Sequence, residues 1–308
     1  MEIVDFYYNS SDGKSKIHGR KWIPKDKKIY NIIQIAHGMV ENLTYHELFA
    51  NYFVEHNFLV VGNDLIGHGL TMKSEDELGM ISDSKDLIED MHKLREIIQQ
   101  EYPNIPYFLI GFSFGSFLVR KYINIYSDKN LNGAIIYGTN SHKPSRLYFS
   151  LKLISLMALF YGWNHRSFYL LRKQFSSPHY KKFDLRTGDP KKSWLTRNEK
   201  YAIRKYKRLP FPLCGYYVVV ETAYYISLDS GVTNIRKDLP IYLISGGDDP
   251  GSFFGTGTIK VFQLFKKNGL TNVSMRIFGL DRHSLMEEYD RINVYDDLIR
   301  WMNENGKK

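Results

Sequence analysis

The chain has 308 residues, of which 43% are hydrophobic and 24% are charged. This length and balance suit a globular protein with a large core and exclude a disordered or fibrous chain. The single cysteine, Cys214, excludes an internal disulfide and fits a reducing compartment, and its surroundings do not resemble a cysteine-hydrolase signature.

The net charge of +9 is concentrated in one segment. Residues 164–208 hold 14 lysines and arginines but three acids, a net charge of +11, so the rest of the chain carries −2. The chain does not open with a basic region followed by an apolar core, so we expect no secretory signal. The longest apolar stretch, residues 147–163, is interrupted by Lys152 and is shorter than the roughly 20 residues of a membrane-spanning helix. We therefore expect a cytoplasmic protein without a membrane anchor.

Six short apolar runs predict buried parallel strands, because apolar residues occupy both faces of most of them. They lie at residues 32–36, 58–61, 107–110, 134–137, 241–244 and 273–278. Helical patterns alternate with these runs, at residues 83–102, 114–126, 258–267 and 285–303. The alternation predicts an α/β fold with a mostly parallel central sheet flanked by helices.

The alternation stops at about residue 139 and resumes at about residue 238. Between these points the sequence is basic and aromatic and contains no clear strand. We predict that residues 1–138 and 238–308 form the α/β core. Residues 139–237 are predicted to form a mainly helical cap that is inserted between strands of this core.

Residues 110–116 read IGFSFGS, a serine between two glycines directly after a predicted strand and before a predicted helix. This pattern is typical of a nucleophile on a strained turn, where Gly111 and Gly115 avoid the crowding of a β-carbon. The alternative is a loop of small residues that happens to contain a serine. Ser113 is the predicted nucleophile, and the backbone N–H of Phe114 is a predicted donor to the oxyanion that forms on attack.

The second oxyanion donor is expected from a loop after an earlier strand. Strand 32–36 leads directly into His37-Gly38-Met39, and the glycine allows close approach of the backbone. We assign the second donor to the backbone N–H of Met39. His37 is expected to shape this loop, and a role as catalytic base is the weaker alternative.

The acid and the base of such a site follow the serine in chain order. Strand 241–244 is followed by SGGDDPG, where Asp248 and Asp249 both qualify. We favour Asp249, and a solvated turn is the alternative interpretation. Strand 273–278 is followed by GLDRHSLMEE, where His283 lies between a strand and a helix and is the predicted general base.

We predict no metal and no cofactor. The chain has one cysteine, no HExxH pattern and no paired histidine spacing. Residues 255–258 read GTGT but lack a complete phosphate-binding or dinucleotide pattern, so they predict the start of a helix.

Residues 36–71, AHGMVENLTYHELFANYFVEHNFLVVGNDLIGHGLT, resemble the monoacylglycerol lipase and lysophospholipase-like branch of the α/β-hydrolase superfamily. Members carry a His-Gly-Met-x-Glu loop and an Asp-x-x-Gly-His-Gly segment, which stand here at 37–41 and 64–69. GFSFGSFLVRKY resembles the family's nucleophile turn, and SGGDDPG and the late histidine also match. SWLTRNEKYAIRKY and PLCGY resemble the cap of bacterial members, so the resemblance covers nearly the whole chain.

The resemblance implies an α/β-hydrolase fold, a mobile cap and hydrolysis of carboxylic esters of lipid-like alcohols. The sequence departs from the family where Phe112 replaces the usual histidine and Phe114 the usual methionine. Neither change removes a catalytic group, and both are expected to reshape the acyl pocket. By motif match, the resemblance assigns the nucleophile to Ser113, the acid to Asp249, the base to His283 and the oxyanion hole to the amides of Met39 and Phe114.

The aromatic and basic side chains of the predicted cap allow two interpretations. One is an ordinary cap core surrounded by solvated charges. The other is an acyl-chain pocket with lysines and arginines around its mouth, which would draw the cap to anionic membranes. We see no nucleic-acid-binding motif and expect no nucleic-acid partner.

The function predicted from these residues is a serine hydrolase that cleaves esters of lipid-like substrates, monoacylglycerol or lysophospholipid, through an acyl-enzyme. Acyl transfer, thioester cleavage and peptide cleavage are alternatives on the same triad. A further alternative is a non-catalytic lipid-binding protein of the same fold. The expected location is the cytoplasm, with peripheral membrane contact as an addition.

Overall fold

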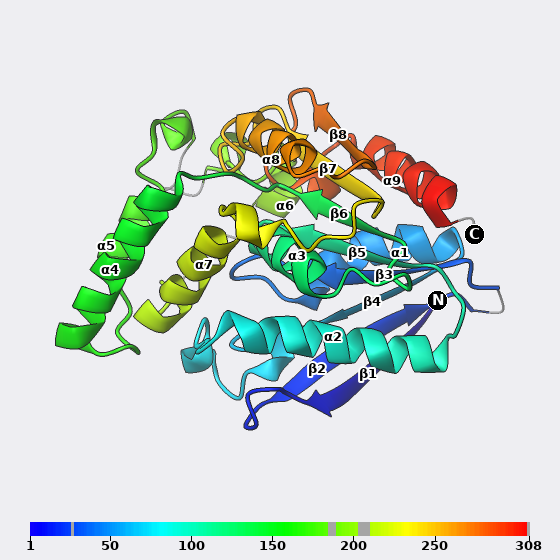
Figure 1. Cartoon of the computed structure of the whole chain (residues 1–308), viewed down its shortest axis with the longest axis horizontal. Coiled ribbons are helices and arrows are strands. Elements are labelled where there is room, and N and C mark those ends of the chain that lie inside the picture. The colour runs from blue at the N-terminus through cyan, green and yellow to red at the C-terminus, as the bar shows by residue number, and fades with distance from the viewer. Residues whose placement is uncertain (26–27, 184–188, 203–209, 307–308) are drawn as a thin grey trace.

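The computed structural model describes residues 1–25, 28–183, 189–202 and 210–306. Its eight strands are β1 (Glu2–Asn9), β2 (Lys16–Ile23), β3 (Asn31–Ala36), β4 (Phe58–Asn63), β5 (Tyr107–Phe112), β6 (Gly133–Tyr137), β7 (Ile241–Gly246) and β8 (Val273–Phe278). They form one sheet in the order β1-β2-β4-β3-β5-β6-β7-β8 (Figure 1). β2 pairs antiparallel with β1 and β4, and all other neighbours are parallel.

All six predicted strands are present, and the predicted α/β fold with a mostly parallel sheet is confirmed. No strand is predicted in the first 23 residues, whereas β1 and β2 form an antiparallel hairpin there. β1 is an edge strand whose residues alternate between exposed and half-buried. Such a strand contains no continuous apolar run, which is the signal that identified the buried strands.

Helices cover both faces of the sheet. They are α1 (Glu47–Glu55), α2 (Ser84–Glu101), α3 (Phe114–Ile125), α8 (Thr256–Lys267) and α9 (Arg291–Gly306). Ile32 of β3 belongs to the apolar core that includes Leu94 of α2, while its neighbour Ile33 belongs to the opposite core with Phe53 of α1. Successive side chains of a strand point to opposite faces, so each interior strand contributes to both cores.

The prediction of one helix over residues 285–303 is wrong at its beginning. Leu285–Glu287 forms a single 3-10 turn, η8, and α9 starts at Arg291. Between them Glu288 is extended, and its carboxylate accepts hydrogen bonds from the backbone N–H groups of Arg197 (3.1 Å) and Arg282 (2.9 Å). These hydrogen bonds, which a continuous helix would not form, hold the chain in its extended path at Glu288. The other three predicted helices are confirmed as α2, α3 and α8, and α8 starts within the predicted segment 255–258.

The segment between β6 and β7 contains α4 (Pro144–Tyr161), α5 (Phe168–Gln174), α6 (Glu199–Ala202) and α7 (Leu213–Tyr225). α4, α5 and α7 lie together at one end of the molecule, on the left of Figure 1. α4 packs against α7, which also contacts α2 and α3. In the described parts of this segment no strand occurs beyond one isolated bridge between Arg166 and Pro212. No helix in the described ranges is both long and apolar enough to cross a bilayer.

Arg120 of α3 joins the two ends of this segment. Its Nη1 donates to Thr139 Oγ1 (3.3 Å) and to the carbonyl of Asn140 (3.0 Å), and its Nη2 donates to the carbonyl of Ile226 (2.9 Å). No acidic partner of this buried guanidinium lies among the described residues, and burial lowers the pKa of Arg120 to about 9. The start of the segment and the end of α7 are thus bound to one side chain of the core.

His18 of β2 lies between two carboxylates. Its Nδ1 is 2.9 Å from Asp64 Oδ2, and its Nε2 is 3.0 Å from Asp5 Oδ1. Burial is the largest single influence and lowers the pKa of His18, but Asp64 and Asp5 together outweigh it and raise the pKa above its usual value. The protonated imidazole donates to both carboxylates and so links β1, β2 and the segment after β4.

We expect the His18→Gln variant to lose more stability at pH 6 than at pH 9. The pKa of His18 is raised in the folded state, so its protonation stabilises the fold below about pH 6.5 and this contribution disappears as the pH rises through the raised pKa. Urea unfolding measures the free energy of unfolding of both proteins. The difference between wild type and variant should be larger at pH 6 than at pH 9 by about 1 kcal/mol or more.

His165 is exposed, so the His165→Gln variant serves as the control. Its free energy of unfolding should differ little from that of wild type at both pH values. A His18→Gln gap that does not change between pH 6 and pH 9 would contradict the assigned protonation.

Candidate active site

Ser113 is the single residue between β5 and α3. Its backbone has φ 53° and ψ −115°, a conformation that residues other than glycine rarely adopt. The N–H of Ser113 donates to the carbonyl of Tyr137 in β6 (3.0 Å), and its own carbonyl accepts from the N–H of Ser116 (2.9 Å). These hydrogen bonds hold the strained turn, which leaves the Ser113 side chain half-buried at a large cavity.

The two glycines around Ser113 are required by close packing. A β-carbon on Gly115 would lie 2.0 Å from the carbonyl oxygen of Ala36, and one on Gly111 would lie 2.3 Å from the carbonyl oxygen of Gly115. The first turn of α3 therefore rests directly on the end of β3. This packing also brings the nucleophile turn against the loop after β3, where a β-carbon on Gly38 would lie 3.3 Å from Ser113 Cβ.

His37 orders that loop. Its Nε2 accepts a hydrogen bond from the N–H of Leu65 (3.1 Å), so its Nδ1 carries the proton and donates to the carbonyl of Gly38 (2.8 Å). Burial lowers the pKa of His37, which favours this neutral form. Both ring nitrogens are used in the loop, as expected of a residue that shapes it, and neither is left for the alternative role of catalytic base.

Glu41 fixes the backbone at the start of the same loop. Its Oε2 accepts from the N–H of Gly38 (2.9 Å) and lies 3.7 Å from His46 Nε2. Within the described ranges, the N–H groups of Met39 and Phe114 donate to no protein acceptor. Met39 and Phe114 both line the large cavity beside Ser113, so the two predicted donors lie at the same opening.

Asp249 and His283 meet at the ends of β7 and β8. His283 Nδ1 lies 2.9 Å from Asp249 Oδ1, which also accepts the N–H of Gly251 (2.7 Å). Both side chains are buried, with residue exposures of 3% for His283 and 0% for Asp249. Because Nδ1 faces the carboxylate, Nε2 is the imidazole nitrogen that remains for a group in the cavity.

Asp248 has a different environment from its neighbour. Its carboxylate pairs with Lys182 and lies 3.7 Å from the guanidinium Nε of Arg282, at the surface of the molecule. It makes no contact with His283 that would orient the imidazole. The geometry therefore favours Asp249 over Asp248 as the partner of the histidine.

The imidazole of His283 and the side chain of Ser113 open on the same cavity. The ring of Phe112, the residue before Ser113, lies 4.9 Å from the His283 ring. A β-carbon on Gly138 would lie 3.2 Å from His283 Cε1, and Gly138 follows the residue that binds the Ser113 N–H. The structure thus brings the three predicted side chains to one edge of the sheet.

The segment before α6 contacts the loop that carries His283. The ring of Trp194 lies 5.0 Å from the His283 ring, and the carbonyl of Leu195 accepts from the N–H of Ser284 (2.6 Å). Arg197 then pairs with Asp281 and with the buried carboxylate of Glu288 (3.1 Å). Burial and the nearby Glu288 charge raise the pKa of Asp281 to about 6.

The large cavity has a volume of about 800 Å³ and is lined by both apolar and polar residues. Glu41 is the only carboxylate among its described lining residues, and it is already engaged by Gly38 and His46. Among the described residues, no group of three or more His, Cys, Asp or Glu side chains is arranged to hold a metal ion. The apolar wall includes Leu147, Ile154, Leu170, Phe211, Tyr216 and Val220.

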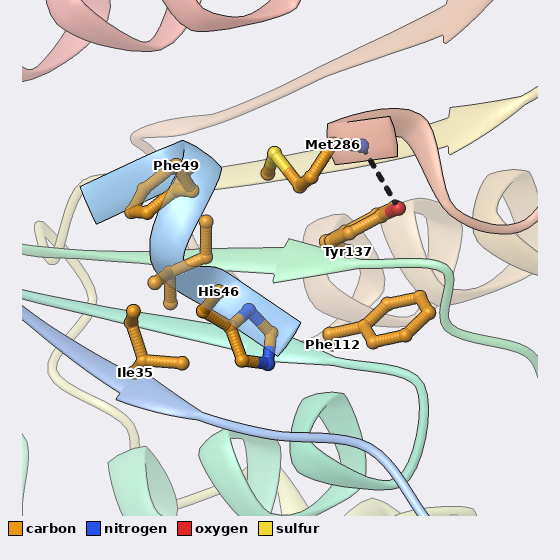
Figure 2. A pocket seen from close by; sticks show the side chains of 7 residues that line it. Ile35, His46, Phe49, Phe112, Tyr137 and Met286 are labelled. Carbon is orange, nitrogen blue, oxygen red and sulfur yellow. Dashed lines mark hydrogen bonds between the residues drawn. The ribbon is translucent and has the colours of Figure 1, made fainter. Parts of the chain in front are cut away.

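A second cavity, of about 10 Å³, lies between the sheet and α1 (Figure 2). It is lined by His46 and Phe49 above Ile35, and by Tyr137, whose hydroxyl accepts the N–H of Met286 (3.4 Å). Its volume is close to that of one water molecule. Phe112 lines both this small space and the cavity that holds Ser113.

The sequence did not predict the residues that support the loops of the site without being among the proposed catalytic residues. Trp194 and Arg197 lie in the basic segment, where no periodic pattern indicates a contact with the His283 loop. Asp64 belongs to a visible motif, but its role depends on distant groups: it accepts the backbone N–H groups of Leu43 and Leu70, each at 2.8 Å.

A serine on the turn between a central parallel strand and its helix, with an acid and a histidine after later strands, defines an α/β hydrolase. The chain belongs to the family described as serine aminopeptidase S33, whose sequence profile matches residues 27–290. It is 23% identical to human monoglyceride lipase over 279 residues, which cover 89% of this chain and 82% of the human protein. The mouse monoglyceride lipase is 32% identical, over 84 residues that span 27% of either chain.

Solved structures show the same fold. A thermostable carboxyl esterase from Bacillus coagulans superposes with a TM-score of 0.87 at 24% identity, covering 100% of both chains. The monoglyceride lipase of Saccharomyces cerevisiae superposes with a TM-score of 0.74 at 16% identity, covering 98% of this chain and 96% of the yeast chain.

We expect Gly115→Ala to destabilise the protein by about 3 kcal/mol or more, because the new methyl group would lie 2.0 Å from a backbone oxygen that cannot move aside. Urea unfolding measures this loss. Gly279→Ala is the matched control, since a β-carbon there meets nothing within 4 Å. Equal stabilities of the two variants would show that α3 does not pack on β3 as described.

Proposed function

We propose that this protein is a serine hydrolase that cleaves carboxylic esters of single-chain lipids. One observation carries the proposal: Ser113 on its strained turn and the Asp249–His283 pair open on one large cavity with an apolar wall. The resemblance to monoglyceride lipases and the membership of an α/β-hydrolase family support the same reaction class.

In the proposed mechanism, Ser113 Oγ attacks the ester carbonyl while His283 Nε2 takes its proton. Asp249 holds the imidazole through Nδ1 and stabilises the cation that forms. The N–H groups of Met39 and Phe114 stabilise the oxyanion of the tetrahedral intermediate. His283 then protonates the leaving alcohol, and afterwards activates the water that releases the acyl group from Ser113.

The apolar wall of the cavity suits an acyl chain. It is formed by α4, α5 and α7, and buried side chains such as Leu147, Ile154 and Leu170 face the space beside Ser113. We assign these helices to a cap that comprises residues 139–237, inserted into a core of residues 1–138 and 238–308. Such a cap would enclose the chain of the substrate and exclude water from the acyl-enzyme.

An ester fits the cavity better than a peptide with a free amino terminus. A substrate ammonium group needs a carboxylate partner in a buried site. In the described lining, Glu41 is the only carboxylate, and it is held by the Gly38 N–H. We therefore favour ester hydrolysis over cleavage of amino-terminal peptide bonds.

The outer surface of α4 and α5 suits contact with a membrane. Large apolar side chains are exposed there, including Phe149 (68%), Leu159 (79%), Phe160 (74%) and Phe168 (62%). No acidic residue occurs between residues 129 and 183. Exposed aromatic side chains with a basic background favour peripheral contact with anionic lipid, which would place a cytoplasmic enzyme at its substrate.

Ser113→Ala should reduce hydrolysis of p-nitrophenyl butyrate by about 10³-fold or more, because no other group supplies the nucleophile. A fluorophosphonate probe should label the wild type and not the variant, while both unfold at the same temperature. Wild-type activity in the variant would exclude the mechanism. Folded wild-type protein that is never labelled would favour a lipid-binding protein without catalysis.

Asp249→Asn should lower kcat by about 10⁴-fold, since the amide no longer stabilises the protonated imidazole. Asp248→Asn is the matched control at the adjacent position, and its kcat should stay within about threefold of wild type, since its carboxylate faces Lys182 instead of the imidazole. If Asp248→Asn were the more damaging change, the acid would have to be reassigned.

A further inference from the structure

We propose that Lys143 and Arg146 bind the phosphate head group of a single-chain lipid ester, so that the preferred substrate is a lysophospholipid rather than an uncharged monoacylglycerol. This inference rests on the ester-hydrolase function proposed above. It names the part of the cavity that distinguishes the two classes of substrate.

The polar wall of the large cavity is positively charged. Lys143, Arg146 and Lys173 line it, and none of the three has an acidic partner among the described residues. Burial and the nearby Arg146 lower the pKa of His142 to about 4, so this neighbouring side chain is neutral at pH 7. With Glu41 engaged elsewhere, the wall offers unpaired cations and no free carboxylate. Lys143 and Arg146 are exposed, and an uncharged glycerol head group would offer them no charged partner.

The cationic wall is connected to the catalytic residues by a short loop. Gly138 packs so close to the His283 ring that a β-carbon there would lie 3.2 Å from Cε1. Lys143 follows five residues later, so even a fully extended chain would place the two residues no more than about 17 Å apart. The loop is held on the way, because Asn140 Nδ2 donates to the carbonyl of Gly251 (2.9 Å), whose N–H binds Asp249. The position of Lys143 relative to the site is therefore set by hydrogen bonds to the loop of the acid.

α4 presents the two halves of a lysophospholipid binding site in sequence. Lys143 is the extended residue directly before the helix, and Arg146 lies in the first turn, where its N–H donates to the carbonyl of Lys143 (3.0 Å). That turn contains no acidic residue. Further along α4, Leu147 and Ile154 also line the cavity, and both are buried and apolar. Arginine and lysine side chains bind phosphate oxygens with charge-assisted hydrogen bonds, and the positive end of the helix dipole favours the same charge.

The test compares 1-decanoyl-glycerol with 1-decanoyl-glycerol 3-phosphate, both assayed as monomers below the critical micelle concentration. In wild type, kcat/KM should be higher for the phosphate ester. In the Lys143→Gln/Arg146→Gln double variant, the ratio of the two kcat/KM values should fall about a hundredfold, since each lost charge-assisted contact is worth about tenfold. Lys152→Gln, on the same helix but outside the cavity lining, should keep the wild-type ratio.

Two outcomes would overturn the inference while leaving the ester hydrolase intact. One is a wild type that prefers the neutral ester, and the other is an unchanged ratio in the double variant. An unchanged ratio together with weaker binding to phosphatidylglycerol vesicles would assign the two cations to membrane docking instead. If wild type cleaves neither ester and no fluorophosphonate label appears, the proposed function itself fails.

Discussion

The site depends on one steric constraint, the direct contact between the first turn of α3 and the end of β3. No β-carbon fits at Gly115, so the helix backbone rests on the carbonyl of Ala36, one residue before the loop that carries the proposed second oxyanion donor. The same contact requires the chain to turn sharply at Ser113, with φ at 53°. The position of the serine and the position of the loop are therefore not independent. A change in how α3 lies on β3 would move both.

The base of the proposed triad is held from two sides that belong to different parts of the chain. Asp249 holds one edge of the His283 imidazole from the core, and the ring of Trp194 lies 5.0 Å from it, from the segment before α6. Arg197 strengthens this link, because its guanidinium is shared by Asp281 and the buried Glu288. Movement of that segment would change the environment of the imidazole directly. In the proposed mechanism, enclosure of the substrate and orientation of the base are thus coupled through a few contacts.

The strands and candidate site residues that could be predicted from the sequence are those that depend on a local pattern of residues. Short apolar runs identified the six strands from β3 to β8. The order of polar residues after three of them identified Ser113, Asp249 and His283 as candidates, which the structure places at one edge of the sheet. The hairpin of β1 and β2 was not predicted, because polar and charged residues interrupt the apolar residues of both strands. The support from Trp194 and Arg197 was not predicted either. It comes from tertiary contacts between residues about 90 positions apart, which leave no periodic signal.

Arg120 determines how the segment between β6 and β7 relates to the rest of the molecule. One guanidinium binds the backbone at Asn140, where the segment leaves the sheet, and at Ile226, near its return. The two junctions therefore lie a few ångströms from a common point inside the core. An insertion whose ends are neighbours can change in length and sequence without displacing the strands on either side. Under the proposed cap assignment, residues 141–225 form a cassette that evolution, or a designer, can exchange to give the same core a different substrate range.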